Sequence, residues 1–317
     1  FIGQERAAED LFYNIVNNQE LAKTDGVYDE ERAIIFLDGP SGTGKTAITK
    51  DITERLDIPF TSTSIVSYSP PGYVGRDVTD TLKDLYKKAN GNLEKAQTGI
   101  VVLDEFDKLA QRGQGLVMEK AVQQQLLDFL GGGKYTLKVG SSIFDSKKIE
   151  FDTSKLTFIC LGALTDLRTS KTKKSQPIGF GNTNFETEQV DYNITPQDLI
   201  SIGFEKKVFN TYLHTDDYSR EALMKILKNS TISPLISFRR WVEARGKKLV
   251  VDEDVFDVIA DKAYELNTGA RSLQTIMNSI RTVYIKEVLR GTNDTITLDS
   301  KTVTNICEQS ISRKRRI

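Results

Sequence analysis

The sequence is poor in the residues that build metal centres and disulfides, since its 317 residues include two cysteines and one histidine. Cys160 lies inside the apolar run LTFICL and Cys307 lies near the C-terminus, a spacing that excludes a cysteine-rich zinc module. Two isolated thiols indicate a reducing compartment, and we expect the protein to be cytoplasmic. His214 has no cysteine or histidine near it in the sequence, which favours a structural or solvent-facing role.

Long apolar runs and an excess of either charge are also absent. No run approaches the roughly 20 apolar residues that span a bilayer, and no signal-peptide pattern appears, so we expect no membrane partner. The 43 basic and 44 acidic residues give a net charge of -1, which argues against nucleic-acid or anionic-membrane binding. The basic end SRKRRI is interpreted as a solvated terminus, with a binding arm as the alternative. Because the first residue is Phe, we expect a fragment of a longer protein.

The order of the sequence patterns predicts an α/β domain followed by a smaller α-rich domain. Continuous apolar runs of buried-strand type occur at 33–38, 99–105 and 155–163, with amphipathic helical patterns between them. Alternating strands and helices indicate a mainly parallel sheet covered on both faces. The alternating stretches KYTLKV and KKIEFDT predict an inserted hairpin. Helical patterns from Tyr218 onward place the small domain in 205–317, after a large domain in 1–204.

The stretch GPSGTGKT satisfies the phosphate-loop pattern G-x-x-x-x-G-K-[ST]. Its glycines would let backbone amides converge on phosphate oxygens, and the following helix would add the positive end of its dipole. Lys45 would reach the terminal phosphates, and Thr46 would supply a hydroxyl to Mg²⁺. A chance glycine turn is the alternative, but the strand before it and the helix after it favour a nucleotide loop. The expected binding residues are Gly39, Pro40, Ser41, Gly42, Thr43, Gly44, Lys45, Thr46 and Ala47.

A second motif, IVVLDEFDK, is an apolar strand that ends in two acids. Asp104 would hold the hydrated Mg²⁺, and Glu105 would orient and deprotonate the attacking water. Arg271 opens a helix of the small domain, where its guanidinium could reach the γ-phosphate; a surface salt bridge is the alternative. We therefore expect an ATPase whose catalytic residues are Lys45, Asp104, Glu105 and Arg271.

Two loops carry apolar residues that no core explains. In PPGYVGRD, at 70–77, prolines and glycines make a loop whose tip, Tyr73 and Val74, faces outward; a buried tyrosine is the alternative. Residues 165–197 are polar and lack periodicity, which predicts a long mobile loop. It contains Ile178, Gly179 and Phe180, an apolar group that could enter a partner's cleft or fold back on its own domain.

The motif order resembles the ClpX family of AAA+ unfoldases across nearly the whole chain. The motifs are FIGQERA, GPSGTGKT, GYVGRDV, GIVVLDEFDKL, VQQQLL, FDTSKLTFICLGAL, IGFG and TGARSL. The combination of a GYVG loop with an IGF tripeptide narrows the resemblance to ClpX, since the related HslU carries GYVG without the IGF loop. The resemblance implies an AAA+ module: a P-loop NTPase with a parallel sheet, then a small α-rich lid domain. It also implies a homo-oligomer, a six-membered ring, that uses ATP and Mg²⁺.

The same resemblance assigns further roles. Tyr73, Val74 and Gly75 would line a central pore and contact a threaded polypeptide, gripping unfolded or tagged proteins by area rather than by hydrogen-bond pattern. Ile178, Gly179 and Phe180 would dock a ClpP-type peptidase, with six weak contacts adding through effective concentration. Ile2, in FIGQERA, is expected at the nucleotide. The implied function is ATP-dependent unfolding and translocation of proteins into that peptidase.

The chain departs from the family pattern in three places. The cysteine-ligated zinc module is absent, FICLGAL has no Asn at the sensor position, and GFEKKVFNTYL offers Lys206 and Lys207 where an arginine finger is expected. Arg220, the nearest arginine downstream, belongs to a helical pattern, so no finger residue is assigned. Two other functions stay open: a nucleic-acid-translocating motor, and a nucleotide-gated scaffold with weak hydrolysis.

Overall fold

A computed structural model describes most of the chain. It covers residues 1–24, 32–69, 75–109, 117–140, 147–165, 167–168, 195–202, 204 and 208–314, without the side chains of 117–120 and 309–314. These residues form two compact units. The sheet unit comprises Arg6–Gly39 and Lys45–Thr215, and the helical unit comprises Phe1–Glu5, Pro40–Gly44 and Asp216–Ile317. Among the described residues, no helix combines the length and the apolar character needed to cross a bilayer.

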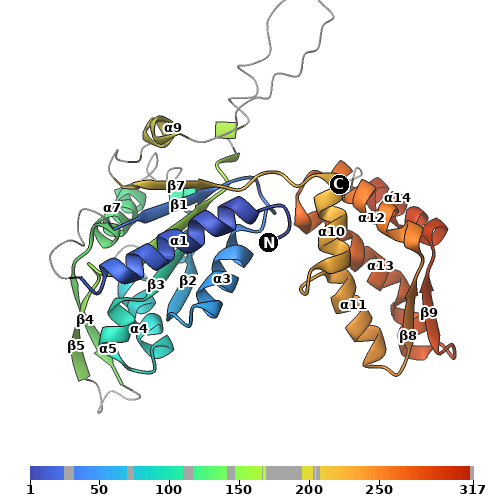
Figure 1. The fold of residues 1–317 in the computed structure, drawn as a ribbon, viewed down its shortest axis with the longest axis horizontal. Coiled ribbons are helices and arrows are strands. Elements are labelled where there is room, and N and C mark those ends of the chain that lie inside the picture. Colours follow the sequence, from blue (N-terminus) through green and yellow to red (C-terminus); the bar gives the residue numbers. More distant parts are fainter. Residues whose placement is uncertain are drawn as a thin grey trace, which may run out of the picture. The chain divides into compact units, whose positions relative to one another are not determined.

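The sheet unit is built on five parallel strands in the order β2-β3-β6-β1-β7. Figure 1 labels four of these strands, β1, β2, β3 and β7. The strands are β1 (Ile34–Asp38), β2 (Phe60–Ser64), β3 (Ile100–Asp104), β6 (Thr157–Gly162) and β7 (Thr211–His214). The predicted parallel sheet is confirmed, and three of its strands are the predicted apolar runs. Because β1 and β3 both pair with β6, their carboxyl ends open on the same edge of the sheet.

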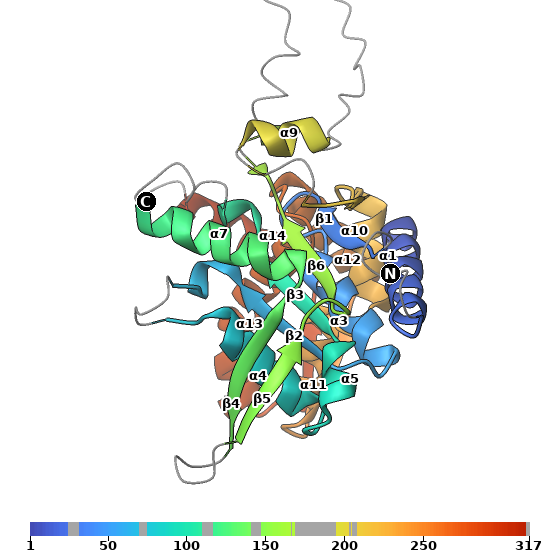
Figure 2. The same ribbon diagram turned by 90° about the vertical axis from the view of Figure 1, so that its left-hand side faces the viewer.

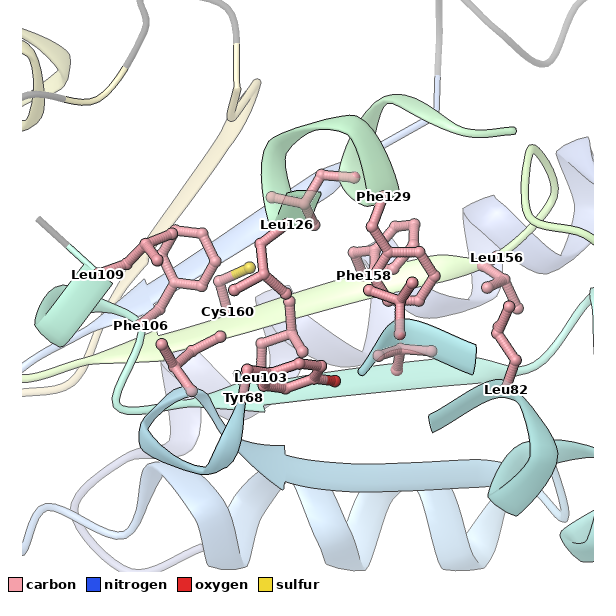
Figure 3. Packing of buried hydrophobic residues seen from close by; sticks show 14 of the residues in the cluster. Tyr68, Leu82, Leu103, Phe106, Leu109, Leu126, Phe129, Leu156, Phe158 and Cys160 are labelled. Atoms are coloured by element: carbon pink, nitrogen blue, oxygen red, sulfur yellow. The ribbon is translucent and has the colours of Figure 1, made fainter. Parts of the chain in front are cut away.

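Side chains of the central strands alternate between two cores, as the two-residue period of a strand requires. One core joins Ile35, Val102 and Ile159 to buried residues of α1 (Glu5–Leu21) and α3 (Lys45–Arg55). The other joins the opposite side chains of the same strands to α4 (Val78–Lys88) and α7 (Val117–Gly131). Figure 3 shows the second core, with labelled side chains of Leu82, Leu103, Leu126, Phe129, Phe158 and Cys160 pointing toward one another.

Strands β2 and β7 were not predicted, because a search for continuous apolar runs does not detect their short and largely polar sequences, FTSTS and TYLH. Both form by pairing with a strand that is already strongly specified, β2 with β3 and β7 with β1. Because β7 pairs with β1, the sheet unit extends to Thr215, whereas the sequence analysis placed the domain boundary after residue 204.

The remaining elements of the sheet unit lie outside the five-stranded sheet. The predicted hairpin forms from β4 (Lys134–Val139) and β5 (Lys147–Asp152), an antiparallel pair that Figure 2 shows as two strands lying side by side. Short helices are η1 (Ile65–Ser67), α5 (Leu93–Gln97) and α9 (Pro196–Ser201).

The helical unit has its own core, to which all of its helices and both of its strands contribute. Its helices are α10 (Arg220–Asn229), α11 (Pro234–Glu243), α12 (Glu253–Glu265), α13 (Ala270–Arg290) and α14 (Ser300–Lys314). The unit also contains a two-stranded parallel sheet formed by β8 (Lys248–Val251) and β9 (Thr295–Leu298). The helical patterns of the sequence correspond to α10, α12 and α13.

Candidate active site

The phosphate-loop motif begins where β1 ends. Gly39 has φ of 147°, and a Cβ on it would lie 2.0 Å from Thr215 Oγ1, so a larger residue would have to displace that threonine. Lys45 opens α3, where free amides at a helix N-terminus attract anions, and its Nζ donates to the Gly39 carbonyl oxygen at 2.7 Å. The lysine is therefore folded back along the loop.

Burial dominates the electrostatics of Lys45. It lowers the pKa of the ammonium from 10.5 to about 8, because the charged form loses hydration. The carboxylates of Asp38 and Asp104 oppose this shift and Arg168 adds to it. An anionic phosphate beside Nζ would favour the charged form, as the predicted role requires.

Thr46 and Asp104 come together although they stand 58 positions apart. Thr46 Oγ1 donates to Asp104 Oδ2 at 2.9 Å, which joins the first turn of α3 to the carboxyl end of β3. A hydroxyl beside a single carboxylate fits Mg²⁺, which keeps several waters and takes its other ligands from substrate phosphates. The structure thus brings together both residues that the sequence proposed for the metal.

Glu105 follows in an uncommon conformation. Its φ is 57°, in the left-handed region, and its side chain is exposed at the edge where β3 ends. Glu105 Oε2 accepts a hydrogen bond of 2.5 Å from Ser64 Oγ, at the end of β2, and its amide donates to Asp104 Oδ1 at 2.8 Å. Sequence analysis missed Ser64, since only the pairing of β2 with β3 places it opposite Asp104.

In the helical unit, Arg271 contacts the phosphate-loop segment Pro40–Gly44. Its Nη1 donates to Ser41 Oγ at 2.6 Å, and the neighbouring Ala270 amide donates to the Gly42 carbonyl at 2.9 Å. Gly42 has φ of 86°, and a Cβ on it would lie 2.2 Å from the carbonyl oxygen of Thr268. The glycine therefore permits this close approach, and Arg271, although exposed, contacts the phosphate-loop segment.

Ile2 belongs to the same unit. The segment that carries it is held by Gln4, whose side chain donates to the Asp216 carbonyl at 2.7 Å and accepts from the Asp216 amide at 3.1 Å. Tyr218 follows closely and donates its hydroxyl proton to the Thr43 carbonyl at 2.8 Å. Ala47, by contrast, is exposed in the first turn of α3 in the sheet unit.

Of the predicted pore-loop residues, Tyr73 and Val74 lie outside the described part of the chain. Gly75 is described, with φ of 155°, and a Cβ on it would lie 1.7 Å from Ser69 Oγ. The backbone on both sides of 70–74 is joined by two hydrogen bonds, from the Ser69 amide to Arg76 and from the Arg76 amide to Ser67, at 3.0 and 3.2 Å. The two ends of this loop are thus fixed side by side.

The predicted docking tripeptide, Ile178 to Phe180, also lies outside the described residues, as do Lys206 and Lys207. The stretch FICLGAL, which has no Asn at the expected sensor position, ends in Ala163 and Leu164, directly after β6. Here the Leu164 amide donates to Asp107 Oδ2 at 3.4 Å, and Leu164 has φ of 48°.

His214, expected to be structural or solvent-facing, lies half-buried at the end of β7. Its Nδ1 is 3.0 Å from Asp38 Oδ1, and Arg168 Nη2 forms a close ion pair with Asp38 Oδ2. Sequence analysis missed this group. A possible signal was Asp38 itself, because a carboxylate that ends a buried strand needs a partner.

Comparison with known proteins finds two family matches. Residues 35–172 match AAA, the ATPase family associated with various cellular activities. Residues 219–304 match the C-terminal D2-small domain of ClpB protein.

Individual relatives cover nearly the whole chain. An ATP-dependent Clp protease ATP-binding subunit ClpX of Bacteroides fragilis is 33% identical over 301 residues, 88% of this chain and 72% of that protein. The ClpX of Porphyromonas gingivalis is 28% identical over 318 residues, 94% of this chain and 77% of its own. That of Treponema denticola is 27% identical over 300 residues, covering 88% and 72%.

Proposed function

This chain belongs to the ClpX family of AAA ATPases, and we propose that it is an ATP-driven protein unfoldase and translocase that feeds a ClpP-type peptidase. The observation that carries the proposal is the hydrogen bond of 2.9 Å between Thr46 and Asp104, with Glu105 next to it. It unites the phosphate loop with the acidic end of β3, which is the arrangement that ATP hydrolysis needs.

The proposed roles follow the positions of the side chains. Lys45, together with the amides of Gly39 to Thr46, binds the phosphates, and Thr46 and Asp104 hold Mg²⁺, which neutralises charge on the transferred phosphoryl group. Glu105 accepts the proton of the attacking water, since its carboxylate is exposed and held by one hydroxyl. Arg271, already bonded to Ser41 of the loop, contacts the γ-phosphate. Ile2 contributes an apolar contact to the nucleotide.

The mechanical part of the proposal concerns the loops 70–77 and 165–197, in which Tyr73, Val74 and Ile178 to Phe180 lie outside the described residues. Six copies of the chain form a ring, Tyr73 and Val74 grip unfolded or tagged proteins in its pore, and Gly75 lets the loop bend. Ile178, Gly179 and Phe180 dock the peptidase. The chain works in the cytoplasm, in line with two cysteines that are both buried and unpaired.

Degradation of a folded, tagged protein tests this function. The chain is mixed with a ClpP-type peptidase and ATP, and loss of the folded substrate is followed over time. We expect degradation only when ATP, chain and peptidase are all present, and Phe180→Ala should abolish degradation while ATP hydrolysis continues. Retained degradation by Phe180→Ala would contradict the docking role.

ATP hydrolysis measured with and without an unfolded protein separates the two other functions. A protein-stimulated rate supports the unfoldase, and a rate that no protein changes supports the weakly hydrolysing scaffold. Stimulation by DNA with a steep salt dependence would instead identify a nucleic-acid motor.

A further inference from the structure

A buried carboxylate lies directly before the phosphate loop. Asp38, the last residue of β1, is 4% exposed, and the motif begins at the next residue. Its Oδ2 pairs with Arg168 and its Oδ1 lies 3.0 Å from His214 Nδ1. Each carboxylate oxygen therefore has a nitrogen partner, as a charge removed from water requires.

Arg168 is held by more than this ion pair. It is 8% exposed, and its Nε donates to the Ala163 carbonyl oxygen at 3.1 Å. The guanidinium therefore bridges the segment that follows β6 and the end of β1, a geometry that suits the planar fork of arginine. Arg32, the other buried arginine among the described residues, donates to the backbone carbonyls of Leu130, Thr153, Ser154 and Leu156.

Both members of the pair act on Lys45. Lys45 Nζ donates at 2.7 Å to the carbonyl oxygen of Gly39, the residue after Asp38, so the ammonium lies near this pair. Asp38 attracts the ammonium and Arg168 repels it, so the two buried charges have opposing effects where phosphate is expected. Charges in a poorly hydrated interior interact strongly over short distances. An unpaired Asp38 would attract Lys45 and repel the phosphates of a nucleotide.

We propose that Arg168 is a positioning residue for ATP binding, which neutralises Asp38 and so leaves Lys45 available to the phosphates. His214 assists by engaging the second carboxylate oxygen. The inference rests on the proposed function, because it takes Lys45 as the phosphate-binding residue. It adds a requirement that the phosphate-loop pattern does not contain: an acid at the end of β1 needs a buried cation from beyond β6.

Nucleotide affinity of charge variants tests the inference. ATP and ADP dissociation constants are measured with Mg²⁺ for the full chain by titration of a fluorescent analogue. Arg168→Met should weaken ATP binding about tenfold, and ADP less, because the repulsion grows with ligand charge. Arg168→Lys keeps the charge that neutralises Asp38 but not the planar fork, so it should lose less ATP affinity than Arg168→Met. Arg55→Met, which removes an exposed cation of the same unit, should change neither constant.

The double variant Asp38→Asn with Arg168→Met keeps the test informative if Arg168→Met folds poorly. It removes both charges, so its ATP affinity should return to the original value. An equally weak double variant would overturn the inference, since the guanidinium itself would then be needed. Equal losses for ATP and ADP in Arg168→Met would overturn it as well.

Lys45→Ala separates this inference from the proposed function. If Lys45→Ala still binds ATP normally, the phosphate role of Lys45 is wrong. If Lys45→Ala loses binding but Arg168→Met does not, only the neutralising role of Arg168 is wrong.

Discussion

Glu105 combines a left-handed backbone with a single short side-chain hydrogen bond, to Ser64. A non-glycine residue in this region costs on the order of 1 kcal/mol, which the surrounding strands must offset. The Asp104 carboxylate contributes by accepting the Glu105 amide at 2.8 Å. In this conformation the Glu105 side chain is exposed, so an attacking water can reach its carboxylate.

Replacing Glu105 by Gln should stop turnover without preventing ATP binding. Glutamine keeps the size and the hydrogen bond to Ser64 but cannot take the proton of water, so we expect a fall in kcat of about 100-fold or more. Steady-state ATP hydrolysis and nucleotide affinity are measured side by side. Glu94→Gln, an exposed acid of α5 in the same unit, is the control. Unchanged turnover in Glu105→Gln would remove the assignment of this base.

Nucleotide affinity should fall as pH rises through about 8, the pKa of Lys45 in the free protein. Below that pH the ammonium is charged and binds phosphate, whereas above it binding must first take up a proton. We expect the dissociation constant of ATP to rise toward tenfold per pH unit between about 8.5 and 9.5. Lys45→Arg, charged throughout, should give a flat profile. A flat profile for the unaltered protein would contradict the lowered pKa.

The lowered pKa of Lys45 affects the stability of the fold in the opposite direction to its effect on nucleotide affinity. The folded pKa of Lys45 lies below the unfolded value of 10.5, so the unfolded state binds more protons between about 8 and 10.5. In this window the contribution of Lys45 to stability increases with pH. A loss of affinity above pH 8 therefore cannot be attributed to unfolding at this residue.

At the scale of elements, α4 begins immediately after the loop 70–77. Asp77 caps it: Asp77 accepts the Asp80 amide at 3.1 Å, and Asp80 accepts the Asp77 amide in return. Arg76, one residue earlier, pairs with Asp84 on the same helix at 2.7 Å. The C-terminal end of the loop is thus attached to α4, whose apolar face packs in the core.

Asp77→Ala should lower the free energy of unfolding by about 1 kcal/mol, because the helix loses its capping acceptor. Asp77→Asn keeps an acceptor and should cost only a few tenths of that amount. Denaturant unfolding of both variants, followed by circular dichroism, measures the difference. Equal losses in the two variants would show that the cap hydrogen bond is not the source of the stability.

At the scale of the whole molecule, the proposed ring couples ATP hydrolysis to movement of the loop that contains Tyr73. Tyr73→Ala should slow unfolding of a folded substrate more than it slows ATP hydrolysis, because an alanine offers little contact area to the polypeptide. Both rates are measured on the same preparation, and Tyr73→Phe, which keeps the ring, should retain most of the unfolding rate. Equal loss of both activities in Tyr73→Ala would argue against a gripping role.

The sequence by itself determined the fold class, the phosphate loop and the acidic pair at the end of β3. These features depend on local patterns: continuous apolar runs, glycines at fixed spacing, and charged residues directly after a buried strand. The same locality explains why the hairpin β4–β5 and the helices α10, α12 and α13 were predictable. Each is specified mostly by its own residues.

Tertiary structure decided the rest. Strands β2 and β7 form because a specified strand pairs with a weak one, and Ser64 reaches Glu105 across 41 positions as a result. Asp38 meets Arg168 and His214 across 130 and 176 positions. Such contacts leave no periodicity in the chain, since the residues become neighbours only when parallel strands align their carboxyl ends at one edge of the sheet.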